Sequence, residues 1–392
     1  MNETPSPQDA LLQQARLLTQ ELALQQRLIA CIPPVPLDGG PASTGQLCTT
    51  IAPSDQMLLH SLGELRDAGA AVSQYFAVGL QQYYALAQSL SVLQPETRPL
   101  RILDFACGFG RALRFLKLTA PGHTLHASEI QPDALDFIRD SLGIETFLSA
   151  ANPLDFSPPG RYDFIWVVSL FSHLPDTLFS GWLERLASLL TDDGLLCFSV
   201  RGASQLSVNK ELPGDGILYE RASEISPLDA DIYGTTYVSD AYVAQKIRSE
   251  CGDVRFACVK RALANEQDLY LVTRNPAIDL DALASRWRHG VWGWVDVRSR
   301  SADGKLHVEG WAGSKESDDP VTHVAIAIDG EVHRVFPAIA RPDVAAFLGS
   351  GDASQDFGWR LELDLPEPRQ SHRLEVCAAT ARQRQLLYYG YV

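Results

Sequence analysis

Hydrophobic residues recur at helical spacing in two stretches near the start of the chain. Leucines and alanines alternate with glutamines from Asp9 to Ile32, and a segment rich in proline and glycine follows over residues 33–44. This pattern predicts one amphipathic helix, which either packs on its own domain or provides a dimer contact, and then a linker. Apolar residues keep the 3.6-residue period again from Ser54 to Leu93, which predicts a second helical region.

Beyond Pro99 the pattern changes to short apolar runs separated by helical segments, as expected of a parallel sheet with crossover helices. Strands are predicted at residues 101–105, 124–128, 145–148, 162–169, 195–200, 254–261 and 268–273. Helices are predicted between them, the clearest at residues 110–118, 132–142, 176–190 and 239–251. This alternation predicts a doubly wound, seven-stranded, Rossmann-like α/β sheet that ends near residues 274–276.

The last hundred residues carry the two-residue alternation of antiparallel strands. Asp303-Gly304 and Asp329-Gly330 each separate two alternating runs, which predicts two hairpins. About seven short strands in this length favour a β-sandwich. The predicted organisation is therefore helix and linker, α/β domain, connector and β-sandwich, at residues 1–45, 46–276 (helical entry 54–93, sheet 100–274), 277–290 and 291–392.

Composition and charge narrow the classes of function. The 392 residues are 46% hydrophobic and 21% charged, which excludes a wholly disordered or collagen-like chain. The net charge of −15 disfavours nucleic acid and anionic membrane surfaces as partners. The seven cysteines form no C-x-x-C pair, and the sequence shows neither a leader pattern nor a long apolar run. We expect a cytoplasmic protein without a transmembrane segment.

The strongest chemical signal is RILDFACGFGR at residues 101–111, where a buried strand runs into glycines and then a helix. Glycines let the backbone turn tightly and leave N–H groups facing a ligand. Glu129 ends the next strand, where its carboxylate can accept hydrogen bonds from both ribose hydroxyls of an adenosine. Leu113 replaces the small residue of the dinucleotide fingerprint, and no phosphate-binding P-loop is present, so NAD and nucleotide hydrolysis are disfavoured. Asp104 suits a ligand with a cationic amino acid group.

Four segments in order, LDFACGFGR, SEI, YDFIWVVSLFSHLP and DDGLLCFSV, resemble class I S-adenosylmethionine-dependent methyltransferases. The resemblance covers roughly residues 54–274 and includes the later DIYGTTY and NEQDLYL. It implies S-adenosyl-L-methionine as the cofactor, with binding residues Asp104, Ala106, Gly108, Gly110, Glu129, Ile130, Asn152 and Ser169. Ala106 departs from the family, which usually has its first glycine there, so we expect weaker rather than absent cofactor binding.

Each of these residues has a role implied by the resemblance. Asp104 and the two glycines would line the methionine moiety, Glu129 would hold the ribose, and Ile130 would pack on the adenine. Asn152 would meet the adenine edge, and Ser169 would border the transferred methyl group. Two alternatives stay open: Asp104 only caps its loop by accepting from backbone amides, or Glu129 is an ordinary surface carboxylate.

The resemblance also places the loop with His173 beside the methyl group, which makes His173 the best candidate for a general base. The alternative is that His173 only orders its loop. Further candidates are Tyr219, Tyr233 and Tyr237, which lie in or beside an irregular insert at residues 201–236. This insert is long enough to form a lid. The three rings could equally be packing aromatics. We take His173 and Tyr233 as the catalytic candidates, with no metal site.

Two regions of the sequence bear on the identity of the acceptor. Ser-Leu-Phe-Ser at residues 169–172 lacks the Asp/Asn/Ser-Pro-Pro-Tyr/Phe pattern of planar-amine methyltransferases, which argues against DNA as the substrate. Tryptophan is concentrated in the C-terminal domain, either as core or as sugar-stacking rings. GVWGWVD, EGWA and ARPDVA weakly resemble β-domains appended to bacterial surface-glycan enzymes. We expect O-methylation of a small-molecule or glycan-linked acceptor in surface polysaccharide biosynthesis; the alternative is a non-catalytic cofactor-binding module with a glycan-binding β-domain.

Overall fold

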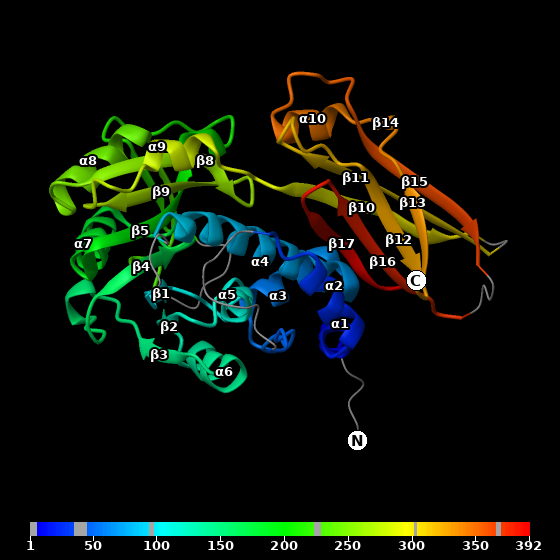
Figure 1. Ribbon diagram of the computed structural model, residues 1–392, viewed down its shortest axis with the longest axis horizontal. Coiled ribbons are helices and arrows are strands. Elements are labelled where there is room, and N and C mark those ends of the chain that lie inside the picture. Colours follow the sequence, from blue (N-terminus) through cyan, green and yellow to red (C-terminus); the bar gives the residue numbers. More distant parts are fainter. Residues whose placement is uncertain (1–5, 35–44, 94–97, 223–228, 302–303, 366–369) are drawn as a thin grey trace. The chain divides into compact units, whose positions relative to one another are not determined.

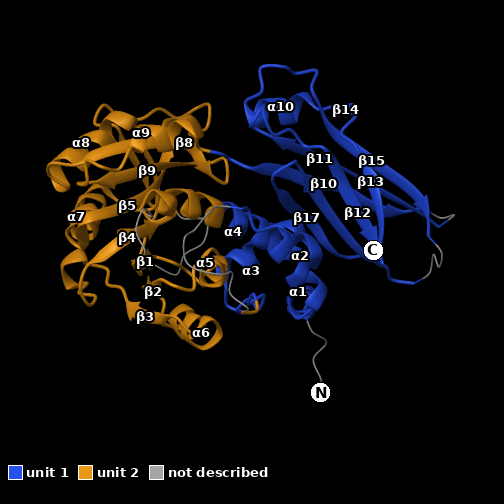
Figure 2. Ribbon diagram, viewed as in Figure 1, with its two compact units in different colours: residues 1–34, 47–81, 288–392 blue, residues 35–46, 82–287 orange. Residues whose placement is uncertain are grey.

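A computed structural model describes residues 6–34, 45–93, 98–222, 229–301, 304–365 and 370–392 (Figure 1). The chain forms two compact units (Figure 2). One comprises residues 1–34, 47–81 and 288–392, and the other comprises residues 35–46 and 82–287. Most of the predicted linker at 33–44, and Asp303 of the first predicted hairpin, lie outside the described residues.

The second unit is built on a doubly wound sheet, as predicted. Its strands are β1 (Arg101–Phe105), β2 (Thr124–Glu129), β3 (Glu145–Leu148), β4 (Tyr162–Val167), β5 (Leu190–Gly202), β8 (Arg255–Leu263) and β9 (Gln267–Thr273). The first five are parallel in the order β3-β2-β1-β4-β5, and β9 runs antiparallel between β5 and β8. Strand order reverses between β1 and β4, which is where ligands bind to such sheets, beyond the carboxyl ends of the strands.

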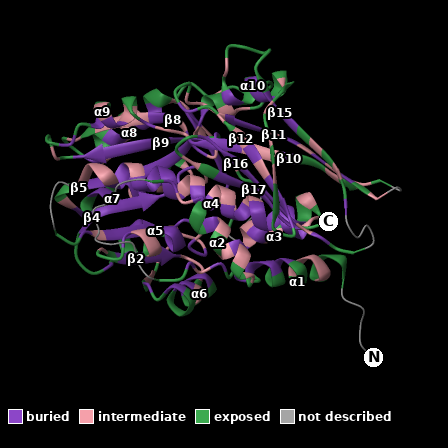
Figure 3. Cartoon of the chain, turned by 45° about the vertical axis from the view of Figure 1, so that its right-hand side comes forward, coloured by how far each residue is buried: buried purple, intermediate pink, exposed green. Residues whose placement is uncertain are grey.

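Four helices of this unit lie between its strands in the sequence, namely α5 (Leu113–Thr119), α6 (Pro132–Leu142), α7 (Asp176–Ser188) and α8 (Asp240–Glu250), and α9 (Leu280–Ser285) follows β9. The sequence predicts α6 to the residue, because Pro132 starts it and Gly143 ends it in the left-handed conformation. Helix α7 buries Trp182 against Phe105 of β1, with ring centroids 4.7 Å apart. Every residue of β4 and of β9 is buried (Figure 3), so the sheet forms the centre of the core.

The insert after β5 is less irregular than predicted. It contains β6 (Ile217–Glu220) and β7 (Thr235–Val238), which pair with each other in antiparallel fashion. Strand β7 also continues the sheet, because it pairs in parallel with Arg201 and Gly202 at the end of β5. These strands have four residues each, which is too short for the two-residue alternation to distinguish them from a loop.

Both predicted N-terminal helical regions are interrupted. The first is α1 (Pro7–Thr19) and α2 (Leu22–Ala30), separated at Glu21, whose backbone is extended. The second is α3 (Gln56–Leu65) and α4 (Ala68–Leu90), with the 3-10 helix η1 (Ser91–Leu93) after it. Arg66 ends α3 in the left-handed conformation, and the Asp67 carboxylate accepts a hydrogen bond from the Ala70 amide at the start of α4.

The C-terminal strands form the predicted sandwich of two four-stranded antiparallel sheets, in the orders β10-β11-β15-β14 and β13-β12-β16-β17. The strands are β10 (Val291–Arg300), β11 (Lys305–Ser314), β12 (His323–Ile328), β13 (Glu331–Val335), β14 (Ile339–Ala340), β15 (Asp356–Asp364), β16 (Arg373–Ala379) and β17 (Arg384–Tyr391). Trp359 is fully buried in the core that the sheets share, and Trp292 is buried in a smaller cluster beside helix α10 (Pro342–Leu348). Both rings are therefore packing residues.

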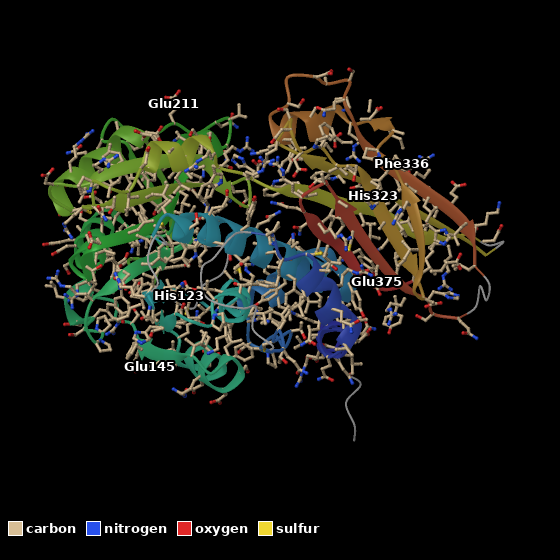
Figure 4. All side chains as sticks on the ribbon, viewed as in Figure 1. His123, Glu145, Glu211, His323, Phe336 and Glu375 are labelled. Atoms are coloured by element: carbon tan, nitrogen blue, oxygen red, sulfur yellow. The ribbon has the colours of Figure 1, made fainter. Side chains whose placement is uncertain are left out.

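Helices from the start of the chain belong to the same compact unit as this sandwich. Ala70 of α4 is part of the sandwich core, and the Ser73 hydroxyl oxygen accepts a hydrogen bond from the Tyr389 amide over 2.7 Å. Arg27 of α2 forms an ion pair with buried Glu375 of β16, labelled in Figure 4, with Nη2 2.6 Å from Oε2. The compact units thus divide the chain differently from the predicted domains, which placed residues 46–81 with the α/β sheet.

Candidate functional site

The loop after β1 takes an unusual backbone path. Ala106, Gly108 and Gly110 all have positive φ, at 56°, 52° and 70°. A methyl group added at Gly108 would find no neighbour within 4 Å, whereas one at Gly110 would lie 3.0 Å from a methyl carbon of Leu142. Gly110 is therefore needed for packing on α6, and the chain leaves open space beside Gly108.

Glu129 ties the loop after β1 to the end of β2. Its Oε2 accepts from the Gly108 amide over 2.9 Å, and its Oε1 accepts from the amides of Ile130 and Gln131 over 2.7 and 3.3 Å. The carboxylate is buried, and this burial raises its pKa although the three hydrogen bonds oppose the rise. Glu129 is thus not a surface carboxylate.

Asp104, at the end of β1, is buried close to Glu129. Burial, together with the charge of Glu129, raises the pKa of Asp104 to about 8. Within the described residues, no hydrogen bond reaches its carboxylate, so Asp104 does not cap its own loop. A buried carboxylate without a donor calls for a cation or a hydrogen-bond donor from a ligand. This arrangement fits the ammonium group of S-adenosylmethionine.

Ile130 and Asn152 lie on the loops that follow β2 and β3. Ile130 is half-buried. Asn152 is exposed, and its side-chain oxygen accepts from the Leu154 amide, which caps the 3-10 helix η2 (Pro153–Asp155). The side-chain oxygen of Asn152 is therefore already the acceptor of a local backbone hydrogen bond.

Ser169 follows β4 and belongs to a polar ring that the sequence analysis did not anticipate. Ser169 has a φ of 61°, and its amide donates to the Ser199 hydroxyl over 2.8 Å. The Ser199 hydroxyl donates to the amide oxygen of Gln267 over 2.6 Å, and the Gln267 amide nitrogen donates to the Ser169 hydroxyl over 2.9 Å. The available signal was a serine inside the apolar run CFSV of β5, because buried polar side chains require partners.

His173 contacts the insert after β5. Its Nδ1 lies 2.6 Å from the Gly234 carbonyl oxygen, and its ring stacks on the Tyr233 ring with centroids 4.5 Å apart and planes 9° apart. The Gly234 amide donates back to the His173 carbonyl over 2.8 Å. A carbonyl oxygen only accepts, so Nδ1 carries a proton and, in the neutral ring, Nε2 carries the lone pair.

Tyr233 is the insert tyrosine that the structure brings to His173. Burial and the nearby Glu129 charge raise the pKa of its phenol to about 12, against an opposing effect of Arg201. Tyr233 therefore stays protonated at neutral pH and does not act as a phenolate base, although its hydroxyl can form hydrogen bonds and its ring can pack. The Tyr219 hydroxyl donates instead to the Ala230 carbonyl over 2.8 Å, within the insert.

The loop after β1 also carries a cysteine, Cys107. Burial raises the pKa of the Cys107 thiol well above its ordinary value, so Cys107 is not a thiolate nucleophile at neutral pH. Over the described ranges, no three His, Cys, Asp or Glu side chains are grouped in a way that could hold a metal ion. In the same part of the chain, none of the helices has the length and apolar character needed to cross a bilayer.

Solved structures similar to this chain include several methyltransferases. The glycopeptide N-methyltransferase MtfA complexed with sinefungin is 17% identical, with a TM-score of 0.36, over 50% of this chain and 94% of that one. A TehB-like SAM-dependent methyltransferase from Corynebacterium glutamicum is 15% identical, with a TM-score of 0.33, over 49% and 88%. The 1,6-didemethyltoxoflavin-N1-methyltransferase of Burkholderia thailandensis is 18% identical, with a TM-score of 0.34, over 48% and 76%.

A family model described as a methyltransferase domain matches residues 103–196. This match runs from β1 into β5 and includes the glycine loop, Glu129 and the strand that leads to His173. It covers the part of the doubly wound sheet in which the strand order reverses. The match identifies residues 103–196 as a methyltransferase domain within a doubly wound sheet, in agreement with the resemblance to class I S-adenosylmethionine-dependent methyltransferases found in the sequence.

Proposed function

We propose that this methyltransferase transfers a methyl group to a hydroxyl of a small-molecule or glycan-linked acceptor. Asp104 carries the cofactor part of the proposal, because it is a buried carboxylate, without a donor from the described residues, next to the open loop at Gly108. Bound S-adenosylmethionine supplies a methyl group on a sulfonium sulfur. The chain's own task is then to hold the two reactants in line and to accept a proton.

The residues that hold the cofactor act from the loops after β1, β2 and β3. Asp104 binds the ammonium group, and the backbone at Ala106, Gly108 and Gly110 surrounds the methionine part. Glu129 accepts from the ribose hydroxyls, and Ile130 packs on the adenine. Asn152 meets the adenine edge through its side-chain amide nitrogen, since its oxygen is engaged with Leu154.

The candidate base is His173. The Gly234 carbonyl holds the proton on Nδ1, so Nε2 of the neutral ring can accept the proton of an acceptor hydroxyl. Tyr233 supports the ring by stacking and keeps its own phenol protonated. Ser169, at the end of β4, borders the transferred methyl group.

The acceptor class and the setting are argued from the C-terminal domain, the net charge and the N-terminal helices. The appended sandwich and the net charge of −15 are compatible with a sugar-containing acceptor and disfavour nucleic acid. Leu17, Leu22 and Ile29 of α1 and α2 are 59%, 62% and 42% exposed, which supports a homodimer contact through these helices. We propose a cytoplasmic enzyme of surface polysaccharide biosynthesis.

One observation favours the alternative of a cofactor-binding module without turnover. Ala106 holds a φ of 56° at the position where a glycine would be free of strain, and a left-handed alanine costs about 1–2 kcal/mol. In that reading the sandwich binds the glycan, and the α/β unit holds the cofactor without transferring its methyl group.

The test starts with calorimetry of the full chain against S-adenosylhomocysteine, followed by a screen for methyl transfer to nucleotide sugars and lipid-linked glycans. We expect binding of S-adenosylhomocysteine without binding of NAD, and a methylated product in the screen. His173→Ala should lower turnover by roughly 10²–10⁴-fold and leave cofactor affinity unchanged. His60→Ala, an exposed site on α3, serves as the control. Cofactor binding without any product would favour the binding module.

A further inference from the structure

The side chains of Ser199 on β5 and Gln267 on β9 close a largely buried ring of hydrogen bonds with Ser169, which follows β4. The donors run in one direction: the Ser169 amide to Ser199, the Ser199 hydroxyl to Gln267, and the Gln267 amide to the Ser169 hydroxyl, over 2.8, 2.6 and 2.9 Å. Ser199 is fully buried on β5, and Gln267 is 8% exposed at the first position of β9. The ring spans 98 residues of sequence.

This ring fixes a backbone conformation that a serine does not readily adopt. The φ of Ser169 is 61°, and a left-handed non-glycine residue needs a surrounding structure that imposes the conformation. The amide that donates to Ser199 belongs to this same residue. Breaking the ring would therefore release the turn at Ser169 rather than only remove one side-chain contact.

The turn at Ser169 in turn sets the position of His173. The Ser172 hydroxyl donates to the Ser169 carbonyl over 3.1 Å, and the His173 amide donates to the Leu170 carbonyl over 2.9 Å. These bonds form a compact turn from Ser169 to His173. Its start is held by the ring, and its end is held by Gly234 of the insert.

We propose that Gln267 and Ser199 are positioning residues of methyl transfer, which hold Ser169 and His173 in the geometry of the reaction without touching the cofactor or the acceptor. The inference rests on the proposed function of this loop. The cofactor residues lie on the loops after β1, β2 and β3, whereas the ring joins the ends of β4 and β5 to β9. Loss of the ring should therefore separate from loss of cofactor binding.

The test compares Gln267→Ala, Ser199→Ala and Ser199→Thr with Thr273→Val in the full chain. Thr273 is the matched control, because it is fully buried at the opposite end of β9 and its hydroxyl donates to the Gly194 carbonyl over 2.8 Å. Its removal also breaks a buried hydrogen bond of this strand, but away from the site. Ser199→Thr keeps the hydroxyl and should restore the ring.

The readouts are amide hydrogen exchange at Ser169 and His173, the NMR signals of the His173 imidazole, and S-adenosylhomocysteine affinity. We expect exchange at Ser169 to accelerate roughly ten- to a hundredfold in Gln267→Ala and Ser199→Ala, as expected for the loss of one buried hydrogen bond. The His173 signals should shift in the same two variants. Thr273→Val and Ser199→Thr should behave like the parent at both residues, and affinity should change less than threefold in all four.

Equal exchange at Ser169 in Gln267→Ala and Thr273→Val would overturn the proposal, as would shifts at His173 in the control alone. Gln267→Glu covers the case in which Gln267→Ala does not fold, because a glutamate of the same size can still accept from Ser199 but, when ionised, cannot donate to Ser169. It should accelerate exchange at Ser169 as well. A parent chain that binds no S-adenosylhomocysteine would refute the proposed function, while the exchange result would still decide whether the ring holds the loop.

Discussion

The backbone amide of Gly108 donates a hydrogen bond to Oε2 of Glu129 over 2.9 Å, which joins the glycine loop after β1 to the end of β2. The two residues are 21 positions apart in the sequence. They meet because β1 and β2 are adjacent parallel strands, so both loops leave the sheet at the same edge. The Glu129 carboxylate thus shapes the loop, and under the proposed function it also accepts hydrogen bonds from the ribose hydroxyls.

Replacing Glu129 with alanine should weaken binding of S-adenosylhomocysteine about ten- to a hundredfold. A hydrogen bond to a charged, buried acceptor contributes about 1.5–3 kcal/mol, which corresponds to this range of affinity. Calorimetry of the full chain measures the change. Glu184→Ala, on the exposed face of α7, is the control and should leave affinity unaltered. A change of less than threefold in Glu129→Ala would mean that the carboxylate only holds the loop.

Ala106→Gly should raise the free energy of unfolding by about 0.5–1 kcal/mol. The gain is the release of the left-handed strain at a φ of 56°, reduced by the greater entropy of glycine in the unfolded chain. Gly108→Ala should have the opposite effect by about 1 kcal/mol, since its φ is 52° but no atom crowds the new methyl group. Thermal unfolding checks both. A stabilising Gly108→Ala would contradict the assigned backbone.

Cofactor binding should become tighter as the pH rises towards 8. The pKa of Asp104 is raised to about 8, so below this pH the free protein must lose a proton before the carboxylate can pair with a ligand ammonium group. Calorimetry between pH 6 and pH 8.5, in two buffers of different ionisation enthalpy, should show proton release that disappears above about pH 8. Asp104→Asn should abolish this release. Proton uptake on binding would contradict the prediction.

The raised pKa of Asp104 also affects the stability of the free protein, and stability should fall with rising pH whereas cofactor affinity should rise. Because the folded pKa lies above the ordinary value of 3.8, the contribution of Asp104 to stability is fully present at low pH. It is lost as the pH rises from about 4 to 8, where the buried group must ionise. Asp104→Asn should therefore stabilise the free protein more at pH 8 than at pH 5 in denaturant titrations. An equal effect at both values would show that Asp104 ionises normally.

Gly69→Ala and Gly63→Ala should change stability in opposite directions. Both residues lie in helices, α4 and α3, where alanine is normally favoured by about 1 kcal/mol. At Gly63 the new methyl group meets nothing within 4 Å, so this variant should be stabilised. At Gly69 it would lie 2.8 Å from the Tyr389 carbonyl oxygen and 2.7 Å from the Tyr388 hydroxyl, so the helix must move away from β17. We expect a loss of about 1–3 kcal/mol in thermal unfolding.

A neutral Gly69→Ala would mean that α4 does not pack closely on β17. It would also weaken the grouping of residues 47–81 with the sandwich. Gly63→Ala controls for the intrinsic helix preference, because it makes the same change of side chain without the close neighbours. The contrast between the two variants therefore reports packing alone.

The sequence by itself determined the doubly wound sheet and the strand-to-glycine turn at the end of β1. Apolar periodicity predicted β1 and α6 within their observed bounds, and Glu129 was assigned from its place at the end of a buried strand. The predictions of β1 and α6 succeed because they depend on contacts within one element or between an element and the next loop, whereas the role of Glu129 stays a prediction. A buried strand followed by glycines has few structural alternatives.

Local periodicity did not show where helices break. Residues on both sides of Arg66 continue one apolar stripe, but Arg66 is left-handed and Asp67 starts a new helix through its hydrogen bond to Ala70. Glu21 interrupts the first helical region in the same way. The spacing of apolar residues shows which side of a helix is buried. When the chain changes direction between two consecutive helices, this spacing can continue unchanged, so it does not show where one helix ends and the next begins.

Only the tertiary structure decided which segments, distant in the sequence, pack against or hydrogen-bond to one another. The packing of Ala70 and Ser73 on the sandwich, the ring of Ser169, Ser199 and Gln267, and the stacking of His173 on Tyr233 join positions far apart in the chain. An amphipathic pattern indicates that one face of an element is buried, but it does not indicate which other element covers that face. A serine in an apolar run indicates a buried hydrogen bond, but it does not indicate which residue is the partner. Those choices depend on how the whole chain packs.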